Sequence, residues 1–440
     1  MFRSRSPFSL GGLILRGVLL AIMITLASCG GGGGGGGGMV DPGAGSGDGS
    51  GDGSGDGSGD GSGDGGDDTS GDDARRAVLA DIANLIILPS LMAFDDRAAN
   101  LEAAVSTFAA SPTDDAARTA AQAAWDAAME SWQRNELLQV GPAGRSQNPD
   151  AVLGGQDFRD FIYSWPFTLN VCALETAAAN GDAVDGLTSI DTTGLGAVEH
   201  LLFTDAPPAE CADQPDAAAR AAHAERLAAR VLLISTVLVS RWDPNEDDFV
   251  AQWSTAGDGS LIYVTPQHGL DALSIALFYG EKQTKDRKVG QTTGVGATGL
   301  ECGNPASCPE FLESRLSRRT GANLAANMQA FRDVFTGVDD GMGLNDLLVG
   351  MDREDLATEV VDQLDIVLAR LEAIELDGGF DAAVEAIDDR TECLNAFSNS
   401  SGLPACALLG EMKAAMDTFR IEIVAALSLA IPDSAAADTD

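Results

Sequence analysis

Histidine and lysine are scarce in this chain. Its 440 residues include only three His and four Lys, against 67 Asp and Glu, and the formal net charge is −40. A surface this negative repels phosphates, so the composition excludes a nucleic-acid-binding protein and disfavours polyanionic substrates and anionic lipid surfaces. The chain is nevertheless 45% hydrophobic and contains five Trp, which indicates a folded body with a core.

Recognisable catalytic motifs are also absent from the sequence. It has no H-E-x-x-H of a zinc protease, no G-x-S-x-G nucleophile elbow and no P-loop. We expect His223 to be a structural residue, because it lies among Ala and Arg on an expected helix, and His268 to lie at a helix start. His200, which follows Glu199, remains as the one histidine that is a candidate metal ligand. The sequence therefore supplies no catalytic set.

The N-terminus has the pattern of an export signal. Arg3 and Arg5 precede an apolar stretch, Gly17 to Leu26, that is too short to span a bilayer but typical of a signal peptide. The stretch ends in Leu26-Ala27-Ser28-Cys29, which resembles the lipobox of bacterial lipoproteins. We therefore expect residues 1–28 to be a lipoprotein signal peptide and Cys29 to carry the lipid that anchors the protein to a membrane.

Glycine dominates the segment that follows. Nine consecutive Gly from Gly30 are followed by five Gly-Ser-Gly-Asp repeats, Gly45 to Asp64. Such a segment cannot bury a core, so residues 29–73 are expected to be a disordered Gly/Ser/Asp tether that reaches on the order of 35–40 Å. Gly30 stands where an Asp would retain a lipoprotein in the inner membrane, which favours the outer membrane of the cell envelope.

Six cysteines remain after Cys29. An even number in an exported chain predicts disulfides, although the sequence alone does not choose among the many pairings. We favour pairing between neighbours, because each bond then closes a local loop. A zinc site is the less favoured alternative, since C-x-x-C is absent and His is scarce. The expected pairs are Cys172–Cys211, Cys302–Cys308 and Cys393–Cys406.

Helical periodicity extends over the rest of the chain, and no run of alternating β-branched residues is present. Pro89 predicts a kink in a first helix from Ala74 to Ala110. Ser111-Pro112-Thr113-Asp114 predicts the start of a second helix, with Ser111 as its cap, that ends near Val140. Further helices are expected over 223–240, 356–374 and 407–431. The fold class is therefore all-α, with antiparallel bundles.

A weak internal match suggests duplication. The segment Gly194–Phe203 has the same residue as Gly269–Phe278 at five of ten positions. We expect two related antiparallel helical bundles, residues 74–255 and 256–440.

Glu199 is the acidic residue of greatest interest. It lies among Leu195, Val198 and Leu201, so it either points inward or lies exposed on its helix. A buried carboxylate needs a partner, a proton or a metal ion. We expect Arg134, Glu136 and Trp165 to lie near Glu199, with Arg134 as its internal partner; the alternative is a separate salt bridge and a core aromatic.

Three of the four lysines lie within residues 281–288. In so acidic a chain, this cluster either neutralises the protein's own carboxylates, which we favour, or binds an anion. Lys285 and Lys288 are therefore candidate ligand-binding residues.

Several segments, in their order along the chain, resemble the imelysin family, which is also grouped with M75 peptidases and includes iron-regulated envelope proteins. They cover about Ala74 to Pro432. The family's signature is G-x-H-x-x-E; here Gly194 and Glu199 match, but Gly196 stands in place of the His. The segments that carry the resemblance are Trp125 to Gly141, Ser164-Trp165-Pro166, Thr193 to Glu199, Lys285 to Gly290 and Phe311 to Ser314.

The resemblance implies an all-α fold of two related bundles and an envelope protein associated with iron uptake. We expect a non-catalytic binding protein that takes iron, another divalent cation or a small iron-containing ligand. The pair Glu199 and His200 is the candidate metal site. A metallopeptidase of the M75 type and a structural or other ligand-binding lipoprotein are the alternatives.

The lipobox predicts that Cys29 is the first residue of the mature protein and is acylated. Mass spectrometry of the mature N-terminus is expected to show a diacyl- or triacyl-Cys. The variant Cys29→Ala is expected to lose its membrane association. If that variant still partitions fully with membranes, the lipid anchor is wrong.

Overall fold

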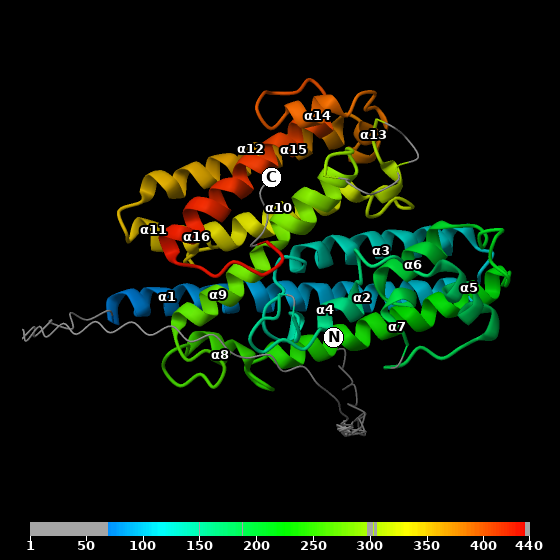
Figure 1. Cartoon of the computed structure of the whole chain (residues 1–440). Helices are drawn as coiled ribbons and strands as arrows, with labels where there is room; N and C mark the ends of the chain where they lie inside the picture. Colours follow the sequence, from blue (N-terminus) through cyan, green and yellow to red (C-terminus); the bar gives the residue numbers. More distant parts are fainter. Residues whose placement is uncertain (1–68, 149, 187, 297–301, 303–305, 436–440) are drawn as a thin grey trace, which may run out of the picture. The chain divides into compact units, whose positions relative to one another are not determined.

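The computed structural model describes residues 69–148, 150–186, 188–296, 302 and 306–435. All regular secondary structure in these residues is helical, which confirms the all-α fold class (Figure 1). The expected signal peptide 1–28, Cys29 and the Gly/Asp repeats lie outside the described residues. Helix α1 begins at Thr69, so residues 69–73 of the expected tether are helical.

One long helical run opens the body. It consists of α1 (Thr69–Asp81), a π-helical segment η1 (Ile82–Ile87) and α2 (Leu88–Ala110). The wide π turn lies directly before Pro89, which has no N–H to donate to the preceding turn. Residues 70–110 are long and apolar enough to cross a membrane. However, Leu79 and Leu101 are fully buried against other helices, so this run serves as a core helix.

Four helices form a first ring, in which each helix packs against the next and the last returns to the first. They are α2, α3 (Asp115–Asn135), α6 (Gly194–Phe203) and α7 (Ala217–Trp242). Short elements complete this half: η2 (Gly141–Ala143), α4 (Phe158–Ile162), α5 (Val171–Asn180), η3 (Ile190–Thr192) and α8 (Phe249–Ser254).

A second ring has the same order of neighbours. It consists of η4 (Gly280–Gln291), α10 (Thr320–Thr336), α12 (Glu354–Leu376) and α15 (Pro404–Thr418). The apolar stripe expected on residues 356–374 is buried along α12. The remaining elements are α9 (Pro266–Leu277), η5 (Pro309–Phe311), α11 (Leu344–Val349), α13 (Phe380–Glu385), α14 (Thr391–Asn395), η6 (Phe419–Ile423) and α16 (Val424–Leu427).

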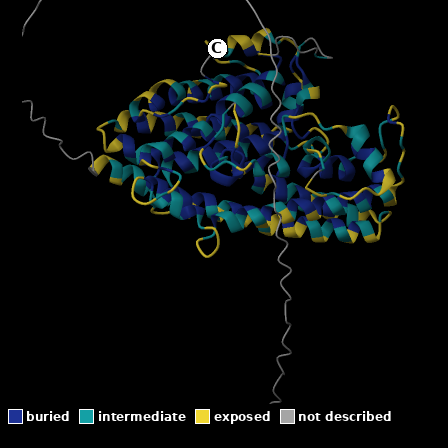
Figure 2. Cartoon of the chain, turned by 60° about the horizontal axis from the view of Figure 1, so that its bottom comes forward, coloured by how far each residue is buried: buried dark blue, intermediate teal, exposed yellow. Residues whose placement is uncertain are grey.

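The two rings meet where α3 packs against α10. Each of these helices is the second of its ring in chain order, so the two rings repeat the same order of helices. The local sequence match that was expected to mark this repeat does not fall on corresponding helices. Gly194–Phe203 is α6, the third helix of its ring, whereas Gly269 lies on α9, which precedes the second ring. Figure 2 shows the buried residues in the interior between the helices and the exposed ones on outer faces and loops.

The expected boundaries of two helices are wrong. Helix α3 ends at Asn135, short of Val140, and it is capped by Asp114, whose carboxylate accepts hydrogen bonds from the backbone N–H groups of Ala116 and Ala117. The final helical run begins at Pro404 and ends at Leu427, where Ser428 adopts a left-handed conformation.

The six cysteines form the three expected disulfides. Cys172 on α5 is bonded to Cys211, Cys302 to Cys308, and Cys393 on α14 to Cys406 on α15, with Cα–Cα distances of 5.1, 5.0 and 4.3 Å. The first bond joins α5 to the segment before α7, and the third holds α14 against α15.

Candidate functional site

A fully buried ion pair lies where the two rings meet. Lys288 on η4 contacts the carboxylate of Glu313 at 2.9 Å, and neither side chain is exposed. Burial lowers the pKa of Lys288 below that of an ordinary lysine, while the Glu313 carboxylate acts in the opposite direction. Lys288 also lies over the rings of Trp165 and Tyr279, with 5.2 and 5.6 Å from Nζ to the ring centroids.

Three buried amides surround this pair. Lys288 Nζ donates to the side-chain oxygens of Gln133 on α3 and Asn327 on α10, at 2.7 and 2.8 Å. Gln133 and Asn323 in turn donate to the two oxygens of Glu313, at 2.9 and 3.0 Å. Because these residues come from both rings, the network joins the two halves of the fold through hydrogen bonds as well as apolar packing.

A second buried ion pair lies beside the first. Glu136, just past the end of α3, contacts Arg159 on α4 at 2.9 Å and accepts a hydrogen bond from the indole of Trp132. Burial acts to lower the pKa of Arg159, but the acidic groups around it, Glu136 first and Asp160 among them, together more than offset this and raise it. Burial, with Glu136 next in effect, raises the pKa of Tyr279 well above its ordinary value, so this phenol remains neutral.

A cleft of about 290 Å³ opens beside these pairs. Its walls include the aromatic rings of Tyr163, Trp165, Phe167 and Phe311, and Arg315 and Leu316 also line it. Its carboxylates are Glu199 on α6, Glu310 on η5 and Glu313. Trp165 and Glu199, which the sequence analysis expected in one site, therefore share a cleft, and Glu136 lies behind it.

Glu199 is only 6% exposed. Its Oε1 accepts hydrogen bonds from the backbone N–H and the hydroxyl of Ser317, at 3.0 and 2.8 Å. Burial raises the pKa of Glu199 to about 7, although the Ser317 hydrogen bonds oppose this shift, and the charge of Glu313 adds to it. Glu199 Oε2 accepts no hydrogen bond from the described residues, so this oxygen is available to a ligand in the cleft.

Glycines shape the start of α6. Gly194 has φ +78°, and a Cβ there would lie 2.6 Å from the carbonyl oxygen of Ile162, so only glycine fits. Gly196 also lines the cleft, but a Cβ on it would meet only the Tyr163 ring, at 3.7 Å. A Cβ therefore fits at Gly196, the position where the family signature has histidine.

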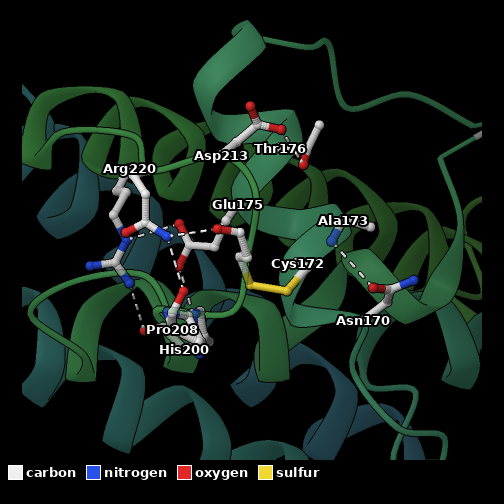
Figure 3. The surroundings of a disulfide bond; sticks show 11 residues. Asn170, Cys172, Ala173, Glu175, Thr176, His200, Pro208, Asp213 and Arg220 are labelled. Carbon is white, nitrogen blue, oxygen red and sulfur yellow. Dashed lines mark hydrogen bonds and ion pairs between the residues drawn. A yellow bond between two sulfur atoms is a disulfide. The ribbon is translucent and has the colours of Figure 1, made fainter.

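His200 lines the same cleft as Glu199, but one of its ring nitrogens is engaged by another carboxylate. His200 Nε2 lies 2.8 Å from Glu175 on α5, and Arg220 on α7 contacts the other oxygen of Glu175 at 3.1 Å (Figure 3). Burial acts to raise the pKa of Glu175, but His200 and Arg220 together lower it. Within the described part of the chain, no three His, Cys, Asp or Glu side chains are placed to hold a metal ion. The candidate metal pair therefore consists of a histidine engaged by Glu175 and a carboxylate held by Ser317.

One further expectation about the site is wrong. Arg134 does not partner Glu199; its side chain is half-exposed and contacts Asp333 on α10 at 3.4 Å. Lys285 contacts Glu281 and Asp286 at 3.0 and 2.9 Å, which is the internal neutralisation that we favoured over anion binding.

Sequence reasoning missed most of the polar network. Ser317 and Arg159 carried no motif that would single them out, and Glu313 lies in the segment Phe311 to Ser314 that carries the resemblance but was assigned no role. Asn323 and Asn327 did leave a signal, because two amides four residues apart on one apolar helix face predict a shared buried partner.

Comparison with known proteins identifies the family. The family profile described as imelysin, Peptidase_M75, matches residues 87–399. The chain belongs to the imelysin family. No curated protein is detectably similar to it.

Two solved structures share the imelysin fold of this chain. One is described as an iron-regulated protein A precursor from Parabacteroides distasonis; it is 16% identical, with a TM-score of 0.58, over 79% of this chain and 95% of its own. The other is an imelysin-like protein from Psychrobacter arcticum, 12% identical with a TM-score of 0.55, over 81% and 96% of the two chains. At such low identity these likenesses show the fold alone.

The raised pKa of Glu199 predicts a pH-dependent stability. The folded protein binds the Glu199 proton more tightly than the unfolded chain, so the contribution of this group is present at acidic pH and is lost as the pH rises from about 4.5 to about 7. Glu199→Gln removes the buried charge and keeps an acceptor for Ser317. We expect it to raise the free energy of unfolding by about 2–3 kcal/mol at pH 8 and to have little effect near pH 4.5.

Urea denaturation at both pH values measures this effect. Glu372→Gln changes an exposed glutamate on α12 and is the matched control. It is expected to change the free energy of unfolding by the same small amount at both pH values. If Glu199→Gln is instead less stable than the wild type at pH 8, the folded protein favours the charged form of Glu199 and the prediction is wrong.

Proposed function

We propose that this imelysin-family protein is a lipid-anchored protein of the cell envelope that binds a small iron-containing ligand without catalysing a reaction. The observation that carries the proposal is Glu199, a buried carboxylate with one oxygen held by Ser317 and the other open to an aromatic-walled cleft. A cation in the cleft would stabilise the charged form of this group and release its proton.

The side chains available to bind a metal favour iron that is already held in a chelate over a bare iron ion. A metal ion bound by protein alone needs several donor side chains, and no such group of three is present in the described ranges. Tyr163 is a poor donor, because burial raises its pKa well above the ordinary value and keeps the phenol protonated. A chelated metal needs only one or two protein donors, and the aromatic walls suit the organic part of a chelate.

A binding role fits the chemistry better than hydrolysis does. Hydrolysis by a metallopeptidase needs a metal-bound water and a general base beside it. The histidine closest in sequence to Glu199 is engaged by Glu175, and Gly196 provides no side chain. Nothing around Glu199 in the described structure therefore activates a water.

The envelope location rests on other features. Three disulfides are typical of exported proteins. The lipobox-like segment at Cys29 supports a lipid anchor, and the Gly-rich segment that follows it directly supports a tether between the anchor and the folded body. The association with iron is supported by the imelysin family and by the relative described as an iron-regulated protein A precursor.

Calorimetric titration of the mature protein with ferric citrate tests the proposal. We expect saturable binding that Glu199→Gln weakens about tenfold or more, as for the loss of a charge-assisted contact, while Glu372→Gln leaves it unchanged. The same preparations are expected to leave casein intact. Chelator-sensitive cleavage of casein would instead support a metallopeptidase, and equal affinities of the wild type and Glu199→Gln would remove Glu199 from the site.

A further inference from the structure

A second, smaller cavity lies beside Arg159. Its volume is about 90 Å³, several times the roughly 10–15 Å³ that holds one water. Pro166 lines both this cavity and the Glu199 cleft, so the segment that carries Trp165 separates the two. Nothing in the proposed iron-binding role uses this cavity.

Three cationic side chains from different segments line the cavity. They are Arg145 from the loop after η2, Arg159 from α4 and Lys282 from η4. Arg159 uses its terminal nitrogens on Glu136 and Asp160, but its Nε is buried and donates to no described residue. Lys282 pairs with Asp286 at 3.2 Å.

Of these three cations, Arg145 is the one without a partner among the described residues. Its guanidinium makes no hydrogen bond or ion pair with any described residue, although it is only partly exposed. A half-buried guanidinium that lines a cavity beside a second guanidinium is a site for an oxyanion, since arginine binds phosphate and carboxylate oxygens through paired N–H groups.

One carboxylate restricts which oxyanion fits. Asp150 also lines the cavity, and its Oδ1 accepts a hydrogen bond from the backbone N–H of Ser434 at 3.1 Å. Its other oxygen accepts none from the described residues. A carboxylate repels a fully deprotonated anion but accepts a hydrogen bond from an anion that still carries a proton. At neutral pH phosphate carries such a proton and sulfate does not.

We propose that this cavity binds a protonated oxyanion, hydrogen phosphate. Arg145 and Arg159 donate hydrogen bonds to its charged oxygens, and Asp150 accepts a hydrogen bond from its P–O–H group. The strong negative charge of the whole chain does not prevent this, because at physiological ionic strength charges beyond about 8 Å are largely screened.

Titration calorimetry of the mature protein in a Tris chloride buffer tests the site. Inorganic phosphate is the probe and sulfate is the comparison. We expect phosphate to bind at least about tenfold more tightly than sulfate, and Arg145→Gln to weaken phosphate binding by about tenfold or more. Arg134→Gln removes a half-exposed arginine elsewhere and is the matched control, expected to have no effect. Glycerol phosphate is a second comparison: its phosphate group is largely without a proton at neutral pH, so it is expected to bind more weakly than inorganic phosphate, and tighter binding would contradict the role of Asp150.

Asp150→Asn tests the role of the carboxylate. Asp150 has φ +63°, a conformation that Asn also adopts readily, so the fold is expected to survive. The variant is expected to lose the preference for phosphate over sulfate. The proposal is overturned if phosphate gives no saturable binding, if sulfate binds as tightly as phosphate to the wild type, or if Arg134→Gln weakens binding as much as Arg145→Gln.

Discussion

The buried ion pair between Lys288 and Glu313 is the constraint on which the rest of the site depends. Removing two charges from water is costly, and it is tolerated only where close contact and further hydrogen bonds compensate both ions. Here Gln133, Asn323 and Asn327 supply those bonds. Because residues of both rings take part, the polar network fixes how α3, α10 and η4 meet. Removal of either ion would leave the other as an uncompensated buried charge.

The cleft follows from this arrangement. Glu313 and Glu199 are both buried carboxylates, but they have different partners. Glu313 is paired with a lysine and two amides, whereas Glu199 has only the Ser317 hydroxyl and backbone N–H. Without a cationic partner, Glu199 has a pKa of about 7, and a ligand cation can supply the missing charge. One carboxylate is therefore neutralised within the protein, whereas the other has no cationic partner among the described residues.

The sequence predicted the fold class and the disulfides well, because both depend on local signals. Apolar residues at helical spacing on α12 and turn residues between paired cysteines need no knowledge of distant contacts. Helix ends were less reliable. Asp114 and Ser111 are both good capping residues, and only the structure distinguishes them.

The site was predicted in part. Glu199 stood out because a charge interrupted an apolar stripe, and Trp165 lies in the same cleft as expected. The hydrogen-bond partner of Glu199 could not be found in the same way. Ser317 lies more than a hundred residues away, on a loop without periodicity, and Arg134 was a plausible choice only by its charge. Long-range polar pairing has no local pattern, so it becomes visible only in the folded chain.

Anomalous diffraction at the iron edge, from crystals of the mature protein grown with ferric citrate, tests the central claim most directly. If the Glu199 cleft is the binding site, the account predicts one strong iron peak beside Glu199 Oε2, between the aromatic walls, and no peak in crystals of Glu199→Gln. An iron peak elsewhere in the protein, or an equal peak in the variant, would contradict it.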